Sequence, residues 1–161
     1  MARFTKEDLQ AVIGAASKDS TRFNINSIHI DGGKLVATNG HYMQSVDTGE
    51  APGVKPFTLG LDDASKLVKA MSREQSVDMG IESEGNRIAC TIDGGGSFEF
   101  AHVAGTYPDY RAVTPKDGGI VSSVVVDAKY LRAICDAAIK SGRSNSKMPK
   151  IQIDIREALS P

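Results

Sequence analysis

The chain has 161 residues, of which 40% are hydrophobic and 24% charged, and its formal net charge at pH 7 is −1. These values exclude a membrane-spanning chain, because no run approaches the ~20 apolar residues that a span requires, and a disulfide scaffold, because there are only 2 cysteines. The N-terminal residues MARFTKEDLQ lack the apolar core of a secretory signal, so we expect a globular, cytoplasmic protein.

One order of elements occurs twice along the chain and then begins a third time. Each unit predicts a short strand, a helix and three strands joined by glycine turns, over about residues 3–48, about 55–103 and again within 118–161. A single unit of this size cannot bury its apolar face alone, so neighbouring units must share a sheet and a helix layer. The sequence therefore predicts an α+β fold of repeated β-α-β-β-β units.

In the first unit, Thr5 is expected to cap a helix that has Asp8 at its third position and ends near Lys18. Alternating side chains and glycine turns then predict three antiparallel strands, over 23–30, 34–38 and 42–47.

The second unit repeats this plan, with a helix that we expect Asp62 to cap. Its strands are predicted over 57–60, 77–81, 87–92 and 97–102. The helix has an apolar face, and its other side carries a basic stripe of Lys66, Lys69 and Arg73.

The third unit predicts another helix, capped by Asp127. Its buried face is predicted to contain Tyr130, Leu131, Ile134, Cys135 and Ala138, and its opposite face a second basic stripe of Lys129, Arg132, Lys140 and Arg143. Two explanations of the stripes stay open on charge alone. They are either ordinary solvated helix faces or a basic strip, formed by aligned helices, that faces nucleic acid.

Two segments carry a more specific signal. Residues 37–43 read Ala-Thr-Asn-Gly-His-Tyr-Met, and residues 105–116 read Gly-Thr-Tyr-Pro-Asp-Tyr-Arg-Ala-Val-Thr-Pro-Lys. Together they resemble the middle domain of the bacterial DNA polymerase III beta subunit, the sliding clamp, where the hairpin reads Ala-Thr-Asp-Gly-His-Arg-Leu and the linker contains Phe-Pro-Asp-Tyr. The resemblance covers 4–116 and continues more weakly to the last unit of the clamp's third domain.

This resemblance implies the DNA clamp fold, with helices on one face of curved antiparallel sheets. It implies a complete clamp-like domain over 1–117 and a partial further unit over 118–161. The implied function is that of a non-enzymatic processivity factor in DNA replication, which binds double-stranded DNA loosely through basic helices. The residues expected to face DNA are Arg22, Lys66, Lys69, Arg73, Lys129, Arg132, Lys140 and Arg143.

The resemblance also implies a pocket for the short clamp-motif peptides of DNA polymerases and other replication or repair factors. Its expected lining is Ile25, Thr38, Gly40, His41, Met43, Pro108 and Val113, with Pro161 at the edge. Further implied partners are a clamp loader and other copies of the chain, since the partial unit would leave an open sheet edge. No membrane partner is expected.

Several positions depart from the family's pattern. Asn39 replaces an aspartate, and Tyr42 and Ala112 each replace an arginine, so two positive charges are missing at or near the pocket. The chain also has one clamp domain and a fragment where the clamp subunit has three. An alternative function therefore stays open: a clamp-fold protein-interaction module, carried by a phage or mobile element, that does not encircle DNA.

Catalysis has little support in the sequence. His29, His41 and His102 and the two cysteines show no metal-ligand spacing, and no carboxylate pair is suggestively placed. A small hydrolase using His41 is a third hypothesis. We expect a non-enzymatic protein with no metal and no cofactor.

Overall fold

The structure is a computed structural model that describes residues 1–49, 51, 53–82, 86–113, 127–132 and 135. The chain divides into two compact regions, an N-terminal region, Met1–Thr114, and a C-terminal region, Pro115–Pro161. Among the described residues, no helix has the length and apolar character needed to cross a membrane.

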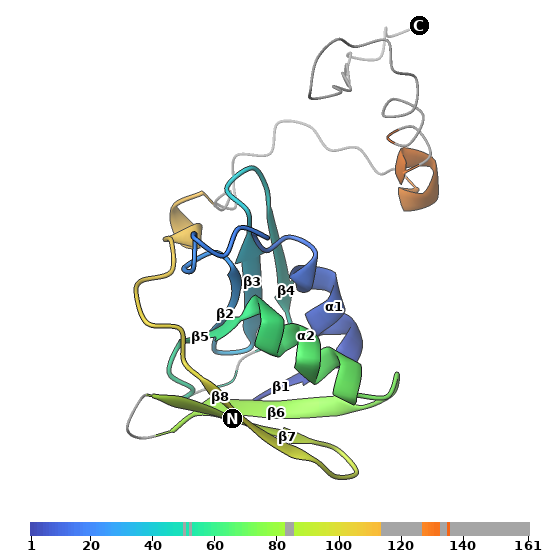
Figure 1. Ribbon diagram of the computed structural model, residues 1–161. Helices are drawn as coiled ribbons and strands as arrows, with labels where there is room; N and C mark the ends of the chain where they lie inside the picture. The colour runs from blue at the N-terminus through green and yellow to red at the C-terminus, as the bar shows by residue number, and fades with distance from the viewer. Residues whose placement is uncertain (50, 52, 83–85, 114–126, 133–134, 136–161) are drawn as a thin grey trace, which may run out of the picture. The chain divides into compact units, whose positions relative to one another are not determined.

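The N-terminal region contains two helices, eight strands and a short 3-10 helix among the described residues (Figure 1). In chain order they are β1 (Ala2–Thr5), α1 (Lys6–Ile13), β2 (Ser27–Asp31), β3 (Lys34–Thr38), β4 (Met43–Asp47), β5 (Phe57–Gly60), α2 (Leu61–Ala70), β6 (Ser76–Ile81), β7 (Arg87–Ile92), β8 (Ser97–Ala101) and η1 (Tyr110–Ala112). This order is the predicted β-α-β-β-β unit occurring twice.

The strands form two antiparallel sheets. Each sheet combines the last three strands of one β-α-β-β-β unit with the first strand of the other unit. The sheet orders are β1-β6-β7-β8 and β4-β3-β2-β5. Thus β1 pairs with β6, Phe4 opposite Val77, while β5 pairs with β2, Leu59 opposite Ile28. An antiparallel bridge between Leu59 and His102 connects the end of β8 to β5. The two units therefore complete one another's sheets.

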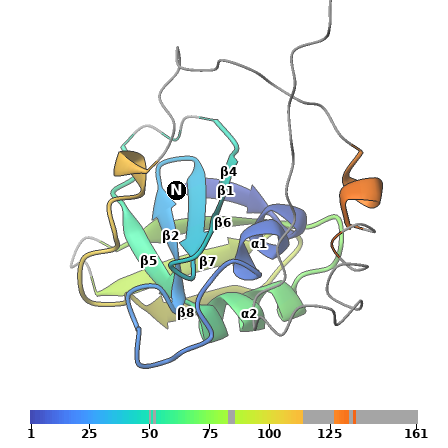
Figure 2. The same ribbon diagram turned by 90° about the horizontal axis from the view of Figure 1, so that it is seen from above.

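The helices lie next to each other and pack on the sheets (Figures 1 and 2). Helix α1 contacts β1, β3 and β4, and α2 contacts β2 and β5. One apolar core joins both β-α-β-β-β units, and its fully buried side chains include Phe4, Leu9, Ile28, Leu67 and Met79. Burial of this continuous apolar surface is the main force that holds the two units together.

The capping of α1 is as predicted. The backbone N–H of Asp8 donates to the hydroxyl of Thr5 at 3.1 Å, and the backbone N–H of Thr5 donates to the Asp8 carboxylate at 2.8 Å. This reciprocal arrangement satisfies two donors that a helix start leaves unpaired.

Three predicted boundaries are wrong. Helix α1 ends at Ile13 and not near Lys18, because the backbone N–H of Ser17 donates to the carbonyl of Ile25 instead of continuing the helix. Strand β2 begins at Ser27 and not at residue 23, since residues 22–26 form a turn with hydrogen bonds to the Arg22 carbonyl.

The third error concerns the cap of α2. This helix begins directly after Gly60, which makes no side-chain cap, and Asp62 lies inside the first turn. Its carboxylate there is still favourable, because the helix N-terminus carries partial positive charge. Smaller differences are that β4 begins at Met43 and that β8 ends at Ala101.

In the C-terminal region, residues 128–132 and 135 are helical. The predicted cap is confirmed, since the Asp127 carboxylate accepts a hydrogen bond from the Lys129 backbone N–H at 2.7 Å. The predicted burial of Tyr130 and Leu131 is wrong, since they are exposed by 73% and 37%. Ile134, Ala138, Lys140, Arg143 and Pro161 lie outside the described residues.

Candidate functional site

A cavity of about 260 Å³ lies between the β3–β4 hairpin and the segment that follows β8. We call this segment, residues 104–113, the strap. The cavity is lined by Arg22, Ile25, Thr38, Gly40, Met43, Tyr107, Pro108, Asp109, Tyr110 and Val113. Six of the eight residues predicted for the pocket are therefore brought together, although β3 and the strap are far apart in the sequence.

The hairpin wall is shaped by local hydrogen bonds. The Thr38 hydroxyl donates to the Tyr42 carbonyl at 2.7 Å, and the Asn39 side-chain oxygen accepts from the backbone N–H groups of His41 and Tyr42. Gly40 has a φ of +90°, which an L-residue with a side chain rarely adopts. Asn39 can thus close this turn in place of the aspartate that the family pattern has there.

The strap wall is shaped by a short helical turn. The Asp109 carboxylate accepts from the backbone N–H of Arg111 at 3.1 Å and so caps η1. Val113, at the end of the turn, is 72% exposed. Ile25 and Tyr107 are buried although neither belongs to the core between the helices and the sheets. The cavity is therefore an apolar site built on the sheet face away from that core.

Two predicted pocket residues and one predicted DNA contact have other positions. His41 does not line the cavity, and Pro161 lies outside the described residues. Arg22, predicted to face DNA, lines the cavity, and its guanidinium donates to the Asn39 carbonyl at 3.2 Å. A Cβ atom on Gly40 would lie 2.9 Å from a guanidinium nitrogen of Arg22, so this cation covers the hairpin turn.

Four lining residues were missed by the sequence reasoning, namely Arg22, Tyr107, Asp109 and Tyr110. The two tyrosines flank the Pro-Asp pair of the recognised linker, and such aromatic residues beside proline are a usable signal for a binding wall. Burial raises the pKa of both the Tyr107 and Tyr110 hydroxyls to about 12. Both side chains are therefore neutral hydrogen-bond donors at pH 7.

The second candidate surface is the exposed side of the helices. Lys66 and Lys69 of α2 are exposed, whereas Arg73, which the sequence predicts on the same helix, lies in the turn that follows the end of α2 at Ala70 and is also exposed. Lys66 pairs with Asp63 at 2.8 Å, which raises the pKa of its ammonium group, and Arg73 lies 3.7 Å from Glu7 of α1. These pairs weaken the field of the stripe.

Two further cations lie in the C-terminal region. Lys129 and Arg132 are exposed on the helix that follows Asp127. In the part of the chain that the structure describes, no group of three or more histidine, cysteine, aspartate or glutamate side chains could hold a metal ion.

Comparison with known proteins identifies the fold. No protein-family model matches the sequence, and no curated protein matches it significantly. Among solved structures, the DNA polymerase sliding clamp of Bacillus subtilis matches with a TM-score of 0.65 and 17% identity, covering 90% of this chain and 40% of that one.

Two further sliding clamps match over a smaller part of the chain. The DNA polymerase III beta subunit of Borrelia burgdorferi, in complex with a natural product, has a TM-score of 0.56 and 20% identity, covering 71% of this chain and 32% of that one. That of Bartonella birtlesii, bound to griselimycin, has a TM-score of 0.56 and 24% identity, covering 72% and 35%.

At these identities the likeness establishes the architecture alone. The chain spans between 32% and 40% of the length of these three clamps. It therefore has the fold of the bacterial DNA polymerase III beta subunit and is a partial clamp-like protein.

Proposed function

We propose that this chain is a non-enzymatic, clamp-like protein that binds short apolar peptides of replication or repair factors in the cavity beside the strap. The observation that carries the proposal is the convergence of Ile25, Thr38, Met43, Pro108 and Val113 on one cavity of about 260 Å³. An apolar notch with few polar groups is suited to holding the Leu or Phe side chains of an extended or turned peptide.

The second part of the proposal is loose binding of duplex DNA by the helices. The cations for phosphate groups are exposed side chains: Lys66 and Lys69 on α2, Arg73 in the turn after it, and Lys129 and Arg132 in the C-terminal region. Partial neutralisation by Asp63 and Glu7 fits a surface that holds DNA without fixing its register. A clamp loader, self-association and a place in the cytoplasm belong to the same proposal, by analogy with the clamps.

The peptide site can be tested by fluorescence anisotropy with a labelled clamp-motif peptide that carries Leu and Phe anchors. Met43→Glu places a carboxylate in the apolar cavity and should weaken binding about a hundredfold or more. Gln44→Glu is the matched control, because Gln44 is the next residue of β4, is exposed and does not line the cavity.

Equal affinity of the Met43→Glu and Gln44→Glu proteins would show that the peptide site is elsewhere. Peptide binding by a protein that has no affinity for duplex DNA at low salt would leave an interaction module as the function.

A further inference from the structure

The outer face of β2 carries two polar side chains directly under the strap. Side chains alternate along a strand, and Ile28 and Ile30 of β2 point into the core. His29 and Asp31 therefore lie on the opposite face, the one away from the core. Both contact the strap.

His29 holds the first part of the strap. Its ring stacks on Tyr107, with centroids 4.7 Å apart and planes 8° from parallel. The Tyr107 hydroxyl reaches the carbonyl of Val36 at 3.5 Å, at the edge of hydrogen-bond distance. Val36 pairs with His29 in the sheet and is fully buried, although it is not part of the main core. Tyr107 and the strap therefore bury the outer face of β3.

Asp31 holds the second part of the strap. Its carboxylate accepts a hydrogen bond from the Tyr110 hydroxyl at 2.7 Å and forms an ion pair with the Arg111 guanidinium, which lies 5.2 Å from the centre of the Tyr110 ring. The Asp31 side chain is only 14% exposed, whereas the acidic partners in the other ion pairs of the described residues are 29% to 64% exposed. The Arg111 side chain is 70% exposed, so water screens the ion pair, and the half-buried hydrogen bond from Tyr110 is the better shielded of the two Asp31 contacts.

Tyr107 is buried, whereas the rest of the strap is exposed or half-buried, so close packing contributes little to holding the strap after Tyr107. Two further cavities border it: one of about 390 Å³ beside Asp31, Tyr110 and Arg111, and one of about 370 Å³ beside His29, Tyr107 and Arg111. After Tyr107, where the strap residues are exposed or half-buried, the position of the strap depends on the contacts of Asp31 with Tyr110 and Arg111.

We propose that His29 and Asp31 are positioning residues of the peptide site, which fix the strap so that Pro108, Tyr110 and Val113 form the wall opposite Met43. The inference rests on the proposed peptide function, but its structural half, the anchoring of the strap, can be measured without any peptide. Neither residue lines the cavity, so each would act through the tyrosine that it holds.

A double-mutant cycle between Asp31 and Tyr110 tests the inference. Tyr110→Phe keeps the ring in the cavity wall and removes only the hydroxyl that donates to Asp31. We expect Asp31→Ala to weaken binding of the labelled clamp-motif peptide about tenfold and Tyr110→Phe about fivefold. The double variant should bind about as weakly as Asp31→Ala alone, because both changes remove the same hydrogen bond. Asp31→Asn, which retains an acceptor oxygen, should recover part of the affinity.

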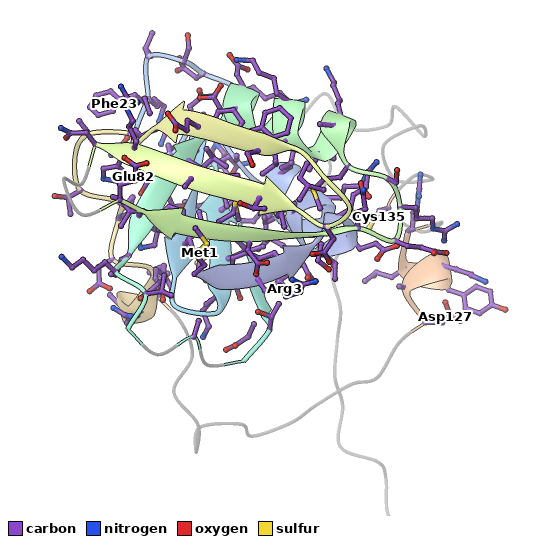
Figure 3. All side chains as sticks on the ribbon, turned by 90° about the horizontal axis from the view of Figure 1, so that it is seen from below. Met1, Arg3, Phe23, Glu82, Asp127 and Cys135 are labelled. Carbon is purple, nitrogen blue, oxygen red and sulfur yellow. The ribbon has the colours of Figure 1, made fainter. Side chains whose placement is uncertain are left out.

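Amide hydrogen exchange measures the anchoring itself. In Asp31→Ala the backbone amides of Arg111, Ala112 and Val113 should exchange at least about tenfold faster than in the unsubstituted protein, while those of β6 and β7 stay unchanged. Asp78→Ala is the control, because it removes the carboxylate of an ion pair with Arg3, at 2.8 Å, in the other sheet. Arg3 lies on the outer face of that sheet (Figure 3). The control variant should change neither exchange in the strap nor peptide affinity.

Each outcome decides one part of the inference. Unchanged strap exchange in Asp31→Ala overturns the anchoring, and additive losses in the cycle, or faster exchange with full peptide affinity, overturn the link to the peptide site. If the unsubstituted protein binds no peptide, the proposed function fails, while the exchange data still decide whether Asp31 holds the strap.

Discussion

At the scale of single residues, His29 makes the stability of the strap face depend on pH. Burial lowers the pKa of its imidazole below the ordinary value of 6.5. The charge of Asp31 acts in the opposite direction, and those of Arg111 and His102 lower it further. The Nδ1 atom also lies 3.1 Å from the Thr58 hydroxyl, within hydrogen-bond distance. The folded protein therefore holds this histidine neutral at pH 7.

A prediction follows from the sign of that shift. As the pH falls through 6.5, the unfolded chain takes up a proton that the folded protein does not, so the free energy of unfolding decreases. In His29→Phe, which keeps an aromatic ring against Tyr107, the decrease between about pH 7.5 and about pH 5.5 should be smaller. Urea unfolding at a series of pH values measures this.

His41→Phe provides the comparison, since His41 is exposed on the hairpin. It should keep the pH dependence of the unsubstituted protein. Identical pH profiles for both variants would mean that His29 does not cause the effect.

At the scale of elements, the basic side chains of α2 and of the turn after it should act on DNA through their charge. Lys69 has no ion pair among the described residues, whereas Lys66 and Arg73 each have one. A cation that binds phosphate releases counterions, so its removal changes the salt dependence of binding and not only the affinity.

We therefore predict that Lys66→Glu together with Lys69→Glu weakens binding to a short DNA duplex. The slope of the logarithm of the binding constant against the logarithm of salt concentration should become shallower by about 1 for each phosphate that the protein no longer neutralises. Titrations at several salt concentrations measure it.

Arg3→Glu together with Arg87→Glu makes the same change in net charge on the other sheet. If that control lowers the slope equally, DNA binding does not involve the helix face.

At the scale of the whole molecule, the exchange of first strands makes the two units interdependent. Without β6, the strand β1 has no partner, and without β1 the apolar residues Ala2 and Phe4 are missing from the core. The same holds for β5 and β2. Neither unit can therefore complete a sheet alone.

This predicts that fragments 1–52 and 53–113 do not fold separately. Far-UV circular dichroism should show no cooperative thermal unfolding for either fragment alone, and a cooperative transition when the two are mixed. Cooperative unfolding of fragment 1–52 by itself would contradict the interdependence.

Most elements could be predicted from the sequence, because strand alternation, glycine turns and the Thr5 cap act locally. Residue-level errors arise where burial continues beyond an element. Ala15 and Ala16 are buried after α1 has ended, so their apolar spacing falsely predicts a longer helix. Phe23 continues the alternation of a strand but is 59% exposed in a turn.

For the candidate site, the motifs at 37–43 and 105–116 predicted pocket residues, and the structure brings most of these together on one cavity. The position of Arg22 could not be predicted, because its side chain can extend in several directions from the loop after α1. Nor could the anchors on β2, since the pattern of His29 and Asp31 is equally that of ordinary solvated strand residues.

By itself, the sequence determined the repeated β-α-β-β-β unit, because periodicity and turn chemistry act locally. Two local motifs, through their resemblance to the sliding clamp, predicted the clamp fold and six of the ten residues that line the cavity. Only the tertiary structure decided the exchange of β1 and β5 between sheets and the attachment of the strap to β2. Those contacts join residues as much as 80 positions apart, as Asp31 and Arg111 are. Their free energy comes from burial and shielding that exist only once the chain has folded.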